Sequence, residues 1–164
     1  MLKQWGWLSV FVIVLDQATK FLAEMMLVMH QPVPLTPSFN LMLTYNTGAA
    51  FSFLANAGGW QRWFFLILGL AVSLGLILWL QRLKPTEKRL AAALALILGG
   101  AVGNLIDRAW LGQVIDFIQL YYQRWYWPAF NIADSAISIG AFLLVLDSLW
   151  PTRADRLKQP TGDG

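Results

Sequence analysis

The chain has 164 residues, of which 57% are hydrophobic and 13% are charged, and its formal net charge at pH 7 is +3. A water-soluble domain of this size buries only about 60–70% of its chain surface, so it could not cover so many apolar side chains. The composition therefore indicates an integral membrane protein. The absence of cysteine and the single histidine, His30, exclude disulfides, thiolate catalysis and a multi-histidine metal centre. Neither a G-x-G-x-x-G nor a Walker pattern occurs, so no cofactor or metal is expected.

Long apolar stretches predict an all-α membrane protein with four transmembrane helices in a single domain, 1–164. A helix needs roughly 20 apolar residues to cross a bilayer core about 30 Å thick. The first span is continuous only if Asp16 and Lys20 are accepted inside the helix. Gly99 and Gly103 form a G-x-x-x-G pattern, which favours close helix packing. The four predicted spans are at about 5–28, 62–80, 90–107 and 132–150.

The basic residues predict the orientation of these spans. They are concentrated at Lys3, in the loop 81–89 and in the tail 151–164, whereas 29–61 contains none. Cytoplasmic loops carry an excess of Lys and Arg, so we expect both termini and the loop 81–89 to be cytoplasmic. The segments 29–61 and 108–131 are then extracytoplasmic. The positive charge is thus a topology signal and a contact for membrane lipids, and no nucleic-acid partner is expected.

The two extracytoplasmic segments have different patterns. In the first, Pro32, Pro34 and Pro37 exclude a helix. The stretch 39–45 that follows alternates apolar and polar residues, which predicts a small sheet on the outer membrane surface, and 46–48 is typical of a turn. The second segment is rich in aromatic side chains, which favour the headgroup region: Tyr121, Tyr122, Trp125, Tyr126 and Trp127.

Ionisable residues near the membrane indicate function, because a charge at mid-bilayer costs at least about 2.5–3.5 kcal/mol. Asp16 and Lys20 are four residues apart on one helix face, so an internal ion pair is the simplest interpretation. Asp107 and Arg108 end the third span, and an interfacial pair whose side chains extend to the membrane surface is one interpretation. The other is that polar residues at the outer ends of the spans converge at one depth near the outer leaflet: Asp16, Lys20, Asn104, Asp107, Arg108, Asp116 and Asp134.

Two further carboxyls have contrasting surroundings. Asp116 lies in the apolar stretch V-I-D-F with no cation beside it, so desolvation should raise its pKa. Asp134 lies in the first turn of the fourth span, where a helix N-terminus stabilises a carboxylate, and helix capping is its alternative role. A protonated and an ionised carboxyl at one depth could activate water against a peptide carbonyl. The hypothesis is that Asp116 begins protonated and Asp134 ionised.

Five motifs occur in order along nearly the whole chain: D-Q-A-T-K at 16–20, N-T-G-A-A-F-S at 46–52, G…G-N-L-I-D-R at 99–108, V-I-D-F at 114–117 and F-N-I-A-D-S at 130–135. Together they resemble the lipoprotein signal peptidase (signal peptidase II) family of aspartic endopeptidases. The resemblance implies cleavage of diacylglyceryl-modified bacterial prolipoproteins just before the lipidated cysteine. It also implies a monomer in the cytoplasmic (inner) membrane, an active site near the outer leaflet, and inhibition by globomycin.

The resemblance assigns roles to nine residues. Asp116 and Asp134 are implied to be the catalytic aspartates. The region 29–59 is implied to form an extracytoplasmic β-cradle with a short periplasmic helix or flap. The residues implied to support the site or bind substrate are Asp16, Lys20, Asn46, Gly48, Asn104, Arg108 and Asn131.

Three alternatives are open at this point. A proton-coupled transporter could use the same carboxyls as a proton relay, although transporters usually contain repeats and none is visible here. An assembly protein could use the glycine pattern for packing. A Ser/Lys peptidase could pair Lys20 with Ser52 or Ser135.

Overall fold

The computed structural model describes residues 1–48 and 59–149. Four of its helices are long and apolar enough to cross a membrane, and a small antiparallel sheet accompanies them, which confirms the predicted fold class. The first helix is continuous through Asp16 and Lys20. The helices are α1 (Leu2–Met26), α2 (Trp60–Arg82), α3 (Lys88–Trp110) and α4 (Ile132–Leu149).

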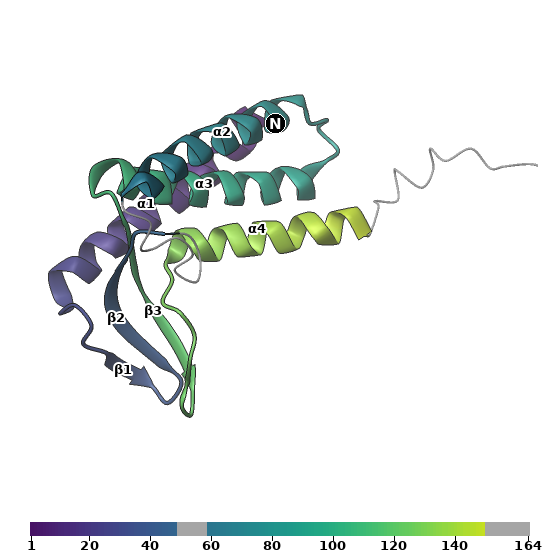
Figure 1. Cartoon of the computed structure of the whole chain (residues 1–164). Helices are drawn as coiled ribbons and strands as arrows, with labels where there is room; N and C mark the ends of the chain where they lie inside the picture. Colours follow the sequence, from purple (N-terminus) through teal and green to yellow (C-terminus); the bar gives the residue numbers. More distant parts are fainter. Residues whose placement is uncertain (49–58, 150–164) are drawn as a thin grey trace, which may run out of the picture.

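Helix α3 lies at the centre of the bundle and packs against the other three helices (Figure 1). Its glycines allow this close packing. A Cβ atom at Gly99 would lie 2.7 Å from the Cβ of Val12 on α1, and one at Gly103 would lie 2.7 Å from Asp16 Oδ2. The predicted G-x-x-x-G pattern is therefore a packing surface between α1 and α3. On another face of α3, a Cβ at Gly100 would overlap the backbone oxygen of Ala133 on α4.

The apolar side chains divide between a core and an outer surface. Leu76 and Leu80 of α2 pack with Leu94 and Leu98 of α3 in one buried cluster. Many large apolar side chains of α1, α2 and α4 are exposed instead, Ile67 at 67% among them. Such a surface is unfavourable in water and suits hydrocarbon, so the helices present it to lipid.

Two segments far apart in the sequence build the sheet. The strands are in the order β1 (Val33–Thr36), β2 (Phe39–Asn46), β3 (Val114–Tyr122) and β4 (Trp125–Tyr126), all antiparallel. The sheet predicted in 29–61 is present as β1 and β2. Its second half comes from the segment for which the sequence predicted only aromatic anchoring. The stretch 114–122 is rich in β-branched and aromatic residues, which suit a strand.

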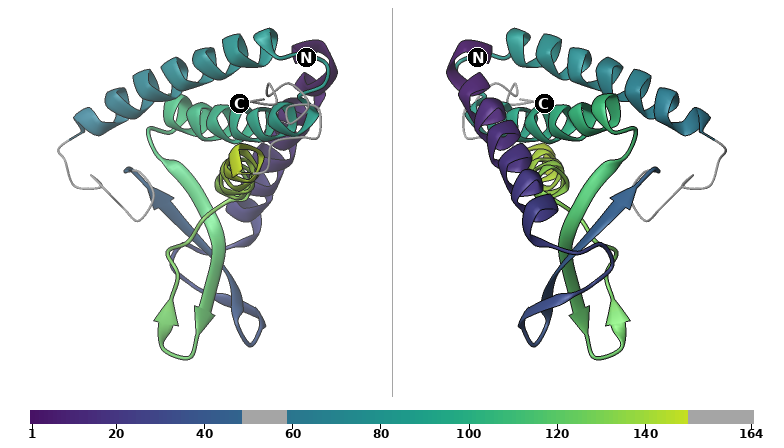
Figure 2. Two further views of the ribbon diagram at one scale, coloured as in Figure 1. Left: turned by 90° about the vertical axis from the view of Figure 1, so that its right-hand side faces the viewer. Right: turned by 90° about the vertical axis from the view of Figure 1, so that its left-hand side faces the viewer.

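The sheet extends from one end of the helix bundle, away from the connection between α2 and α3 (Figure 2). Thr44 of β2 pairs with Asp116 of β3, and Asn46 pairs with Val114. A bridge between Ile118 and Phe130 then returns the chain to the start of α4. This pairing brings the ends of β2, β3 and α4 together. The short helix or flap was expected somewhere within 29–59; the described part of that region holds β1 and β2, and 49–58 lie outside the described residues.

Candidate active site

Asp134 lies in the first turn of α4, and Asn131 caps this helix. The Asp134 N–H donates to Asn131 Oδ1 at 2.8 Å, and the Asn131 N–H donates to Asp134 Oδ2 at 3.4 Å. This reciprocal pair is a capping box. The carboxylate of Asp16 reaches across from α1 and accepts the next N–H, from Ala133, at 2.8 Å. Two carboxylates therefore complement the positive end of α4.

Capping does not occupy both oxygens of Asp134. Its Oδ1 accepts a hydrogen bond from Asn104 Nδ2 of α3 at 2.8 Å. The alternative raised by the sequence, a capping carboxylate, is therefore observed, but the same carboxylate also belongs to a polar cluster between α3 and α4.

Asp116 lies on β3 and is almost fully buried, with 2% of its surface exposed. Asn131 Nδ2 donates to its Oδ1 at 2.7 Å, and Asn46 Nδ2 donates to its Oδ2 at 3.3 Å. Burial raises the pKa of Asp116 to about 7, and the negative charge of Asp134 acts in the same direction. The hydrogen bonds from Asn46 and Asn131 and the charge of Lys20 oppose this rise. The predicted rise in pKa is confirmed.

Asn131 connects the two aspartates. Its Nδ2 contacts Asp116 Oδ1, while its Oδ1 accepts the Asp134 N–H. The same Nδ2 also lies 3.2 Å from Asn104 Oδ1 and 3.2 Å from the Ile115 carbonyl oxygen. Because Asn131 is fully buried, its side chain has one well-defined orientation. It fixes the relative position of β3 and the first turn of α4.

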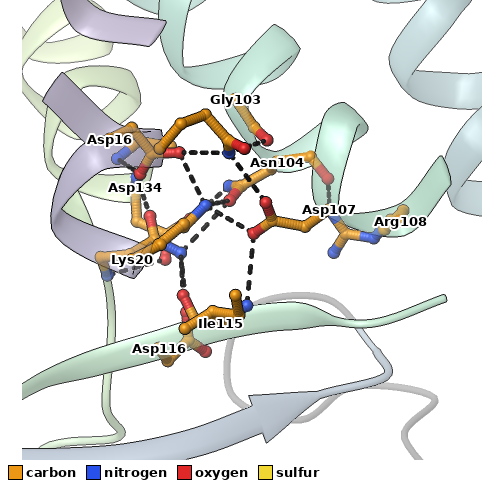
Figure 3. Close-up of polar contacts among 12 residues, drawn as sticks. Asp16, Lys20, Gly103, Asn104, Asp107, Arg108, Ile115, Asp116 and Asp134 are labelled. Atoms are coloured by element: carbon orange, nitrogen blue, oxygen red, sulfur yellow. Dashed lines mark hydrogen bonds and ion pairs between the residues drawn. The ribbon is translucent and has the colours of Figure 1, made fainter. Parts of the chain in front are cut away.

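Lys20 lies next to the aspartates, at the centre of a buried ionic cluster (Figure 3). Its Nζ is 2.7 Å from Asp16 Oδ2, 2.7 Å from Asp107 Oδ2 and 3.1 Å from Asn104 Oδ1. The predicted ion pair with Asp16 is confirmed. Three partners match the three donors of an ammonium group. A Ser/Lys peptidase needs its lysine directed at the nucleophilic serine, whereas Lys20 is directed at Asp16, Asp107 and Asn104, and Ser135 donates to the Asn131 carbonyl instead.

Of the two interpretations that the sequence left open for Asp107 and Arg108, convergence with the other polar residues is confirmed and the interfacial pair is wrong. Asp107 is 3% exposed and points inward, where its carboxylate accepts from Gln17 Nε2 at 2.8 Å and from the Ile115 N–H at 3.3 Å. Successive residues on a helix do not face the same side, and Arg108 points elsewhere (Figure 3). Asp107 thus connects α1 with Ile115, the residue before Asp116.

Arg108 joins α3 to the end of β2. Its Nη2 donates to the Gly48 carbonyl at 2.8 Å, and its guanidinium lies 5.1 Å from the centre of the Phe65 ring. The Gly48 N–H in turn donates to Asn46 Oδ1 at 3.0 Å. The turn at 46–48 is thereby held so that the Asn46 amide faces Asp116.

Three residues that hold this site together were not assigned a role in it from the sequence. Gln17 and Asp107 belong to the ionic cluster and lie inside the five motifs, and Asp107 was expected to converge with the other polar residues without a stated role. Arg62 of α2 donates to the carbonyls of Arg108 and Ala109, which end α3, at 3.1 and 2.7 Å. No sequence signal identified Arg62, because its partners are backbone atoms far along the chain.

Asp116 and Asp134 line one cavity of about 960 Å³. Asn46, Asn104 and Arg108 line it as well. Asp16, Lys20 and Asn131 support it through the contacts above, and Gly48 contacts Arg108 and Asn46. The fold thus gathers all nine residues that the resemblance selected, from α1, α3, α4, β3 and the end of β2. A cavity with two carboxyls and a flanking guanidinium is suited to acid–base chemistry on a polar group.

Four membrane-crossing helices, with one buried and one half-buried carboxyl in one cavity, define a multi-pass membrane protein with an enzyme-like site. The comparisons with known proteins agree with this class. A family model described as signal peptidase (SPase) II matches residues 8–150. The chain belongs to this family and is a peptidase, which confirms the resemblance.

The similar proteins extend over most of the chain. A lipoprotein signal peptidase of Pseudomonas fluorescens (strain Pf0-1) is 58% identical over 145 residues, 87% of this chain and 85% of that protein. One from Teredinibacter turnerae is 55% identical over 150 residues, 92% of this chain and 89% of that protein. A solved structure described as a bacterial membrane enzyme is 27% identical, with a TM-score of 0.84, and the match covers 98% of this chain and 94% of that one.

Proposed function

We propose that the chain is an aspartic endopeptidase that removes signal peptides from diacylglyceryl-modified bacterial prolipoproteins. It cleaves just before the lipidated cysteine, with Asp116 and Asp134 as its catalytic residues. The observation that carries this proposal is the shared cavity, in which Asn131 holds one carboxyl and caps the helix of the other. The names of the similar proteins support the substrate class.

In the proposed reaction, Asp134 is ionised and takes a proton from a water molecule, whose oxygen bonds to the scissile carbonyl carbon. Asp116 begins protonated, consistent with a pKa of about 7, and gives its proton to the carbonyl oxygen. A gem-diol results. It collapses as Asp134 transfers its proton to the departing nitrogen, the carbon–nitrogen bond breaks, and Asp116 recovers a proton from a hydroxyl of the gem-diol.

The other residues stabilise this arrangement. Asn46 and Asn131 hold the Asp116 carboxyl, and Asn104 holds Asp134. Arg108 lines the cavity, where its guanidinium can stabilise negative charge that develops on the carbonyl oxygen before the gem-diol is formed. Asp16 and Lys20 stabilise the junction of α1, α3 and α4 next to the cavity.

The proposal includes a location in the cell. The protein is a monomer of the bacterial inner membrane with both termini cytoplasmic, and the extracytoplasmic segments are 29–61 and 108–131. The active site then lies near the outer leaflet, where a lipidated substrate can enter laterally from the bilayer. Globomycin is expected to bind in the same cavity.

The test is a gel-shift cleavage assay on a diacylglyceryl-modified prolipoprotein in detergent or lipid. The Asp116→Asn and Asp134→Asn variants are compared with wild type and with Asp147→Asn, the same change near the other end of α4. We expect wild type and Asp147→Asn to cleave in a globomycin-sensitive manner, and both catalytic variants to lose at least about 10³-fold in rate.

Substantial cleavage by either folded Asn variant would exclude the aspartic mechanism. A serine mechanism is tested in parallel with a Ser52→Ala, Ser135→Ala double variant, which we expect to remain active. If wild type fails on a substrate that another lipoprotein signal peptidase cleaves, the proposed activity itself is wrong.

A further inference from the structure

The polar side chains of α4 are distributed unevenly. Between Asp134 and Asp147 the helix has only two, Ser135 and Ser138. Both line the cavity that holds the two aspartates. The face of α4 that packs against α3 carries small apolar residues instead, with Gly140 in contact with the α3 backbone. Every polar group in this part of the span therefore faces the cavity.

The two hydroxyls differ in what they bind. Ser135 Oγ donates to the Asn131 carbonyl at 2.9 Å, within the cap of its own helix. Ser138 is exposed, and within residues 1–48 and 59–149 its hydroxyl makes no hydrogen bond. By contrast, the buried Ser9 of α1 donates to the Ala95 carbonyl of α3 at 2.8 Å, so its hydroxyl stabilises helix packing. In the described part of the chain, the hydroxyl of Ser138 makes no comparable hydrogen bond that would stabilise helix packing.

Ser138 follows Asp134 by four residues, which places it on the same face of α4 and one turn further along the helix. A signal segment keeps its positively charged start on the cytoplasmic side, so it approaches the aspartates from that direction. Residues just before the scissile bond then run along the part of α4 that carries Ser138.

Hydrolysis requires this part of the substrate to leave its helical form. Inside a helix the scissile carbonyl accepts a hydrogen bond from a later N–H, and the turn around it hides it from water. Opening the last turn frees N–H and C=O groups, which are costly to leave unpaired at membrane depth. A hydroxyl with one donor and two acceptor positions can pair with either kind of group.

We propose that Ser138 is a substrate-binding residue, whose hydroxyl pairs with the opened backbone of the signal segment just before the scissile bond. This inference rests on the proposed function and adds a contact on α4 that lies outside the five motifs. Ser135 contributes less to substrate binding, because its hydroxyl already donates a hydrogen bond to the Asn131 carbonyl.

The test compares Ser138→Ala and Ser138→Thr with wild type on a diacylglyceryl-modified prolipoprotein. Ser148→Ala is the matched control, since this hydroxyl lies on the same helix outside the cavity and bonds the Val145 carbonyl. Losing one hydrogen bond to substrate should lower kcat/KM of Ser138→Ala about three- to tenfold. Thermal stability should not change. Ser138→Thr restores a hydroxyl and should recover at least half of the wild-type kcat/KM, and Ser148→Ala should match wild type.

Ser138→Ala with kcat/KM within twofold of wild type would overturn the inference and leave the proposed function intact. A loss that Ser138→Thr does not reverse would also overturn it, because the hydroxyl would not be the cause. Failure of wild type to cleave would overturn the proposed function, and this inference with it.

Discussion

Asp116 links the electrostatics of the site to a measurable pH dependence. Its pKa is raised to about 7, first by burial and then by the charge of Asp134. If the protonated form of Asp116 is active, the rate should fall as pH rises through about 7, approaching tenfold per unit above it. A profile of kcat/KM between pH 5 and pH 9 measures this descending limb. A rate that instead rises through pH 7 would assign Asp116 the opposite protonation state.

The hydrogen bond from Asn46 to Asp116 allows a second test of this pH dependence with a single variant. Its hydrogen bond favours the ionised form of Asp116 and so lowers the pKa. In Asn46→Ala that bond is lost, the pKa rises, and the descending limb should move to higher pH by about half a unit to one unit.

Asn40→Ala is the matched control for this shift. Asn40 is an amide on the same strand, but it donates to Gln119 rather than to Asp116. Its variant should keep the wild-type midpoint. A limb that moves to lower pH in Asn46→Ala, or moves equally in both variants, would contradict the assignment.

Among the elements, α3 and α4 are held at a distance that only glycine permits. A Cβ at Gly100 would overlap the Ala133 carbonyl and lie 2.7 Å from Ile137 Cγ1. Gly100→Ala must therefore displace the first turn of α4, which carries Asp134. We expect a loss of about 1–3 kcal/mol in stability together with a marked loss of kcat/KM, measured by thermal unfolding in detergent and by cleavage.

Gly75→Ala separates this packing effect from helix propensity. Gly75 is also in the interior of a membrane helix, but nothing lies within 4 Å of a Cβ built there. Its variant should be as stable as wild type or more stable, by up to about 1 kcal/mol, with unchanged activity. Equal effects of the two substitutions would show that the α3–α4 contact does not control the site.

The sequence could predict elements whose signal is local. The helices follow from apolar runs, and β2 follows from alternation in 39–45. Strand β3 was missed because its aromatic end is equally typical of a membrane anchor, and its partner β2 lies some 70 residues earlier in the sequence. The ion pair of Asp16 and Lys20 was predictable from helical spacing. For Asp107 the sequence left an interfacial and an inward position open, because the choice depends on where Lys20 and Gln17 of α1 lie.

At the scale of the whole molecule, the cavity lined by Asp116 and Asp134 and the basic loop lie at opposite ends of the bundle. The sheet and the start of α4 are at one end, while the connection between α2 and α3 is at the other (Figures 1 and 2). That connection is flanked by Arg82, Lys84, Lys88 and Arg89. Basic loops stay in the cytoplasm, so this geometry supports a site near the outer leaflet.

The absence of cysteine allows this orientation to be tested with single substitutions. Ser38→Cys lies in the exposed turn between β1 and β2, and Thr86→Cys lies in the exposed connection between α2 and α3. In intact spheroplasts a membrane-impermeant maleimide should label the first variant at once. It should label the second only after permeabilisation, and the unsubstituted chain gives the background. Labelling of Thr86→Cys in intact spheroplasts would invert the topology. The cavity would then lie on the cytoplasmic side, where a translocated and lipidated precursor could not reach it.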